Sequence, residues 1–147
     1  MRKILILLSV LALAGCTPAV SMDAAEYANH PGCAEVSVRL PDTISDLPKR
    51  YTNAQATSAW GEPAAILLRC GLEKVEISAL PCVTAGVVDW LVDDSMAPNY
   101  RFISFATEPA VEVIVDSTNA SGITALEAIS QAVSMLEVTK KCSTVTN

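Results

Sequence analysis

The stretch WGEPAAILLRCGLEKVEISALPCVTAGVVDWL, residues 60–91, decides how the rest of the chain is arranged. Gly61 and Pro63 mark a turn, and the apolar run 64–70 follows it directly. A second apolar run, 87–92, comes after a mixed segment that begins at Gly71. The pattern predicts two core strands joined by a loop that a disulfide can close.

Further strands and a helix are predicted on the C-terminal side of this stretch. Segments 101–106 and 110–116 are separated by a connection of hairpin length, and the second alternates apolar valines with polar residues, as in a sheet with one wetter face. From residue 121 the apolar period changes to that of a helix. We therefore expect an α+β fold, a small antiparallel sheet of about four strands with a C-terminal helix packed on it.

The N-terminal residues have the form of a bacterial lipoprotein signal. Arg2 and Lys3 precede the apolar segment 4–14, and Leu13-Ala14-Gly15 precedes Cys16. An apolar segment this short is below the roughly 20 residues that span a bilayer, so we predict a cleaved signal peptide at 1–15. Cys16 is the predicted lipidation site, which places the protein at the extracellular face of the cell membrane. Residues 16–32 are expected to form a flexible tether, and 33–147 a single globular domain.

The charge excludes one class of partner. The formal net charge is −6, and removal of residues 1–15 with Arg2 and Lys3 brings it to −8. A negative domain is repelled by phosphate backbones, so nucleic acid is not an expected partner. Attachment to the membrane is expected through the lipid and not through charge.

Cysteine use agrees with an oxidising compartment. Beyond Cys16 the chain has four cysteines, an even number outside the cell, which predicts two disulfides and leaves three possible pairings. No two of these cysteines have the spacing of a structural zinc site, and the chain has one histidine, His30. We expect no metal and no cofactor.

Catalytic residue types are sparse. The only histidine lies in the expected tether, and Asp89, Asp93 and Asp94 form the densest acidic cluster. Trp60 and Trp90 can line a groove, although tryptophans beside apolar strands more often fill a core. Arg69 lies inside an apolar strand, so it needs either solvent, a bridge to Glu112 or Asp89, or an anionic ligand. Arg69, Trp90, Asp89 and Trp60 are the candidate binding residues.

Several short motifs resemble a family of actinobacterial secreted proteins and lipoproteins catalogued as a domain of unknown function, number thirty-five fifteen. They are Trp60-Gly-Glu-Pro, Leu68-Arg-Cys-Gly71, Val88-Asp-Trp90 and Pro109-Ala-Val-Glu-Val113. The periodicity of 33–40 fits both a strand and a helix, and the resemblance favours an N-terminal helix there. If Cys33 opens that helix and Cys142 follows the last one, the expected disulfides are Cys33–Cys142 and Cys70–Cys82.

Two functions from different classes follow from these observations. The first is a lipid-anchored cell-envelope protein that acts as a non-catalytic binding or accessory module, with an envelope protein or a glycan as partner. The alternative is an envelope hydrolase that uses carboxylates such as Asp89.

Overall fold

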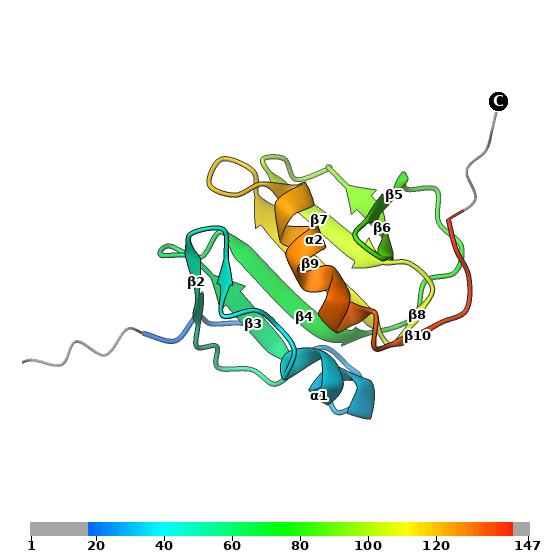
Figure 1. The fold of residues 1–147 in the computed structure, drawn as a ribbon, viewed down its shortest axis with the longest axis horizontal. Coiled ribbons are helices and arrows are strands. Elements are labelled where there is room, and N and C mark those ends of the chain that lie inside the picture. The colour runs from blue at the N-terminus through cyan, green and yellow to red at the C-terminus, as the bar shows by residue number, and fades with distance from the viewer. Residues whose placement is uncertain (1–17, 143–147) are drawn as a thin grey trace, which may run out of the picture.

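The computed structural model describes residues 18–142, in which two short helices lie against one large antiparallel sheet (Figure 1). Within these residues no helix is long and apolar enough to cross a membrane. The elements are α1 (Pro31–Ser37), β1 (Thr43–Ile44), β2 (Leu47–Arg50), β3 (Thr57–Trp60), β4 (Ile66–Leu72), β5 (Cys82–Ala85), β6 (Val88–Asp93), β7 (Asn99–Ser104), β8 (Thr107–Glu108), β9 (Ala110–Asp116), α2 (Gly122–Val133) and β10 (Glu137–Val138).

The sheet has eight strands in the order β1-β2-β3-β4-β9-β7-β6-β5, while β8 and β10 form a separate pair. The expected small four-stranded α+β fold is therefore wrong. The four strands predicted from apolar runs correspond to β4, β6, β7 and β9, which are six or seven residues long. The strands that extend the sheet at both sides, β1, β2, β3 and β5, have only two to four residues. Such short segments carry too little periodicity to be recognised from the sequence.

The main core lies between the helices and one face of the sheet. Ile66, Leu68 and Cys70 of β4 are paired with Val115, Val113 and Val111 of β9, and all six are buried. The apolar face of α2 packs against them, as do Cys33 and Val36 of α1. This alternation gives the sheet a helix-covered face and an opposite face. We call the second the open face because neither helix covers it.

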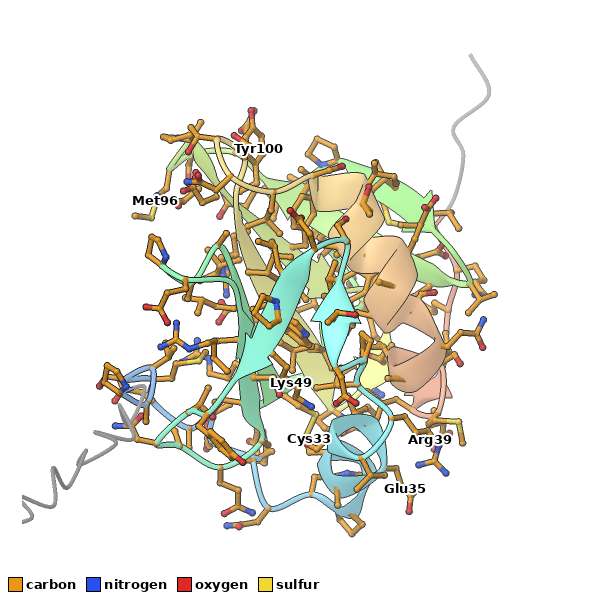
Figure 2. All side chains as sticks on the ribbon, turned by 60° about the vertical axis from the view of Figure 1, so that its left-hand side comes forward. Cys33, Glu35, Arg39, Lys49, Met96 and Tyr100 are labelled. Carbon is orange, nitrogen blue, oxygen red and sulfur yellow. A yellow bond between two sulfur atoms is a disulfide. The ribbon has the colours of Figure 1, made fainter. Side chains whose placement is uncertain are left out.

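Helix ends are capped by local side chains. The Ser121 hydroxyl accepts a hydrogen bond from the Thr124 amide, so the cap of α2 lies three residues before the Thr124–Glu127 capping box that its sequence resembles. His30 caps α1, since its Nδ1 accepts a hydrogen bond from the Gly32 amide at 3.0 Å. In Figure 2, Glu35 and Arg39 lie on the outer side of α1, where they form an ion pair. Their exposure and the burial of Cys33 orient the helix.

Two further segments of the chain cover or border part of the open face. Residues between β4 and β5 contribute Val75 and Leu80 to a small second cluster with Leu91, Ile103 and Ala110. The Tyr27 amide donates to the carbonyl of Gly71, so the N-terminal segment reaches the end of β4. The described part of the expected flexible tether, residues 18–32, is thus hydrogen-bonded to the domain.

The disulfides are Cys33–Cys70 and Cys82–Cys142. Two disulfides were expected, but the expected pairing, Cys33–Cys142 with Cys70–Cys82, is wrong. The buried Cys33–Cys70 bond joins α1 to β4, with 5.6 Å between the Cα atoms. The second bond joins the start of β5 to the end of the described chain. Cys70 lies on the helix-covered face and Cys82 on the open face, so the sheet itself separates the two cysteines that sequence proximity would pair.

Candidate binding surface on the open face

Three charged side chains from three neighbouring strands meet on the open face. Arg69 of β4 is paired directly with Glu112 of β9, and Arg101 of β7 is paired with Ile114, two residues further along β9. Because residues two apart in a strand point to the same face, all three charged side chains emerge on the same side. We call Arg69 and Arg101 the arginine pair, and the group that they share is the carboxylate of Glu112.

The carboxylate is held from both sides. The Nε of Arg69 donates a hydrogen bond to Oε2 of Glu112 at 3.0 Å, and Nη2 of Arg69 lies 2.7 Å from the same oxygen. The Nε of Arg101 pairs with the other carboxylate oxygen, Oε1. The Glu112 side chain is 7% exposed, whereas those of Arg69 and Arg101 are 31% and 37% exposed. Two guanidinium groups on one carboxylate give these three side chains a net charge of +1, and Asp93 of β6, the cross-strand partner of Arg101, offsets it. Within residues 18–142, Nη1 of Arg69 and both Nη atoms of Arg101 have no hydrogen-bond acceptor.

Apolar side chains adjoin this cluster. Leu67 of β4 faces Ile114 of β9, and both are half-buried although neither belongs to a core cluster. They lie in one cross-strand row between Ala59 and Arg101. The surface therefore combines outward-facing guanidinium donors with a small apolar patch. Such a surface suits a ligand that has a carboxylate next to an apolar group.

Asp89 is placed away from this cluster and is used structurally. The residue is 6% exposed. Its Oδ1 accepts a hydrogen bond from the Thr84 hydroxyl at 2.6 Å, and its Oδ2 accepts one from the Cys142 amide at 2.9 Å. Of the two bridges expected for Arg69, the one to Glu112 is present and Asp89 has other partners. Asp89 ties the C-terminal segment to the β5–β6 hairpin.

Both tryptophans are fully buried on the helix-covered side, so neither lines an open surface. Trp60 Nε1 donates to the carbonyl of Pro41 at 2.9 Å. The indole N–H of Trp90 is the one buried side-chain polar atom without a partner in the described part of the chain. The candidate residues thus divide into two core tryptophans, a buried structural aspartate and one surface arginine.

Sequence reasoning missed Arg101 as a partner of this site. The signal was present, because Arg101 lies diagonally across from Glu112, on the same face, once segments 101–106 and 110–116 are paired as a hairpin. Only the order of strands, with β9 between β4 and β7, shows that Arg69 and Arg101 flank the same carboxylate.

A second concave region lies where α1 begins. A cavity of about 330 Å³ is lined by Tyr27, His30, Lys74 and Glu108, among others. The Glu26 carboxylate beside Tyr27, together with burial and with Glu73, raises the pKa of the phenol above its usual value. A hydrogen bond and the charge of Glu108 raise the pKa of the Lys74 ammonium.

Among residues 18–142, no group of three or more His, Cys, Asp or Glu side chains is arranged to hold a metal ion.

Cys16, the predicted lipidation site, lies outside the described residues, as does the predicted signal peptide at 1–15. No curated protein and no solved structure matches the chain. Residues 3–141 match the sequence model of a family described as protein of unknown function (DUF3515). This match covers nearly the whole chain, and the protein therefore belongs to that family.

Proposed function

We propose that this protein is a lipid-anchored, extracytoplasmic cell-envelope protein that serves as a non-catalytic binding module. The leader at 1–15 and the lipobox before Cys16 support the anchor, and the family match itself begins within the leader, at residue 3. Two disulfides that use all four remaining cysteines support an oxidising compartment.

The observation that carries the binding role is the arginine pair on the open face. Burial of Glu112 fixes both arginines in position, since a buried carboxylate needs its partners. Their remaining Nη donors are then held in place before any ligand arrives, which lowers the entropic cost of binding an anionic group.

The carboxylates considered for hydrolysis are engaged elsewhere. Both oxygens of Asp89 already accept hydrogen bonds, and a substrate would have to displace the C-terminal segment to reach them. Asp93 accepts a hydrogen bond from the Ser95 amide at 3.0 Å in the turn after β6, and hydrogen bonding to Ser95 lowers its pKa. These roles favour the binding module over the hydrolase.

The expected partner is an envelope protein that presents a carboxylate next to an apolar side chain. The carboxylate pairs with the free Nη atoms of Arg69 and Arg101, and the apolar group covers Leu67 and Ile114. Bidentate pairing of this kind supplies both orientation and specificity.

Site-specific photo-crosslinking in the native envelope tests this proposal. A photoreactive phenylalanine analogue replaces Ile114 on the open face, and a matched control carries it at Met135, which is exposed just after α2. We expect a discrete protein adduct from position 114 that is absent from position 135. The adduct should weaken in high salt, because exposed charge pairs are screened.

The variant Arg101→Gln identifies the contact, with Arg69 left to hold Glu112. The adduct at position 114 should be lost while the variant remains folded at the temperature of the assay, and Lys49→Gln should leave the adduct intact. An adduct that persists in Arg101→Gln, or equal adducts from positions 114 and 135, would show that the open face is not the binding surface.

A further inference from the structure

The beginning of the described chain is docked against the loop that joins β2 to β3. The Val20 amide donates to the carbonyl of Tyr51 at 2.8 Å, and the Asn53 amide donates to the carbonyl of Val20 at 3.2 Å. Val20 also forms a parallel bridge with Thr52. The Met22 amide donates to Oδ1 of Asn53 at 2.7 Å. Residues 20–22 thus follow the 51–53 segment through one isolated β-bridge and the hydrogen bond to Asn53.

Arg50 fixes the position of Pro18, the first described residue. Its Nη2 donates to the carbonyl of Pro18 at 3.0 Å, and its Nη1 donates to the carbonyl of Gly61 at 3.0 Å. Nη1 also lies 2.5 Å from a carboxylate oxygen of Glu62. The Arg50 side chain is only 10% exposed. A guanidinium held at both ends in this way makes Pro18 part of the domain.

Only one residue, Thr17, separates Pro18 from Cys16. An extended chain covers at most about 3.5 Å per residue, so the Cα of Cys16 lies within roughly 7 Å of the Cα of Pro18. A lipid on Cys16 has its acyl chains in the bilayer and its backbone at the headgroup level. Pro18, and the loop that holds it, must then be close to the same level.

We infer that the loop Lys49–Asn53 lies directly on the membrane surface, with Tyr51 and Lys49 in the phospholipid headgroup layer that holds the protein's own anchor. This inference rests on the proposed lipidation of Cys16. On this inference the domain does not move freely on a tether. Hydrogen bonds to residues 18–22 set its orientation to the membrane.

The side chains of the loop suit this environment. Tyr51 is 87% exposed, and tyrosine is enriched at membrane interfaces because its ring is apolar and its hydroxyl is polar. Lys49, Arg50, Tyr51 and Asp42 line a cavity of about 340 Å³. Glu62 neutralises the charge of Arg50, and Asp42 offsets that of Lys49, so the loop and its neighbours have little net charge. The anchor, and not electrostatic attraction, must therefore hold the loop at the surface.

The opposite side of the domain then faces away from the membrane. In Figure 1 the described chain begins at the left beside β2 and β3, while its last residues lie at the right, beyond β5. Ile77, which is 89% exposed, belongs to the segment between β4 and β5. It provides a reference position for water exposure.

Depth measurement on the lipidated full-length protein tests the inference. A spin label is placed on a non-canonical amino acid at position 51 or, as control, at position 77, and the protein is reconstituted in vesicles of phosphatidylethanolamine and phosphatidylglycerol. We expect the label at position 51 to lose collisions with a water-soluble nickel chelate and to gain collisions with oxygen, whereas position 77 remains water-exposed. A Cys16→Ser form mixed with the same vesicles should leave both positions water-exposed.

A Gly-Ser insertion between Cys16 and Thr17 separates anchoring from docking. The inserted protein should stay on the vesicles while the label at position 51 becomes as water-accessible as that at position 77. Intact-mass measurement reports the lipid independently. A lipidated protein whose position 51 is already water-exposed without the insertion overturns this inference alone, and so does protection of position 51 in the Cys16→Ser form. Absence of the diacylglycerol mass overturns the anchor as well.

Discussion

Removal of the buried disulfide gives the sharpest test of how this domain is held together. Replacement of Cys33 and Cys70 by alanine frees α1 from β4. The two cysteines are 37 residues apart in the sequence. The chain-entropy relation for a loop of that size gives a loss of about 3.8 kcal/mol in the free energy of unfolding, because the unfolded chain regains the freedom that the bond removed.

This loss converts into a melting temperature. The 125 residues from 18 to 142 give an unfolding entropy of about 0.26 kcal/mol/K at roughly 2.1 cal/mol/K per residue. The double variant should therefore melt about 15 °C below the unmodified protein. Replacement of Cys82 and Cys142, which are 60 residues apart, should lower the free energy of unfolding by about 4.3 kcal/mol and the melting temperature by about 16 °C.

Circular dichroism melts of both double variants, combined with peptide mapping under non-reducing conditions, make the measurement. The two bonds also differ in access, since Cys33 and Cys70 are buried and Cys82 is exposed. A mild reductant should therefore open Cys82–Cys142 first in the native protein. A fall of only a few degrees for the Cys33/Cys70 variant, or a mapped Cys33–Cys142 peptide, would refute this reasoning.

Three further substitutions test separate features. Glu112→Gln should lower the free energy of unfolding by about 2 kcal/mol in urea melts, because the arginine pair loses its buried carboxylate, whereas the exposed Glu127→Gln should have no effect. Gly71→Ala should cost at least about 2 kcal/mol and expose residues 20–28 to hydrogen exchange, since φ is +111° and the new Cβ would lie 2.5 Å from the backbone of the N-terminal segment. Hydrogen bonds from Thr118 and Asn119 lower the pKa of Asp116. The ionised carboxylate therefore stabilises the folded state above the unfolded-state pKa of about 3.9. This stability is lost as the pH falls through the lower folded-state pKa. Asp116→Ala should therefore destabilise the protein at neutral pH and match the unmodified protein in strong acid. Equal melts of Asp116→Ala and the unmodified protein at neutral pH would contradict this.

The long strands and the C-terminal helix follow from the amino-acid pattern. Segments near 66–72, 88–93 and 110–116 are rich in apolar residues over six or seven positions, and that length is enough for burial to dictate an extended conformation. The helical period after Ser121 likewise predicts α2. The bridge from Arg69 to Glu112 was also predictable, because an arginine within a buried strand needs a cross-strand partner.

The size of the sheet, the disulfide pairing and the second arginine of the site depend on long-range packing. Strands of two to four residues, such as β1 and β5, form because longer neighbours offer them hydrogen bonds, and nothing in their own sequence requires it. Cys70 and Cys82 are close in the chain but emerge on opposite faces of the sheet, so each pairs with a distant cysteine on its own side. Arg101 reaches Glu112 because β9 lies between β4 and β7, and strand order depends on packing across the whole domain.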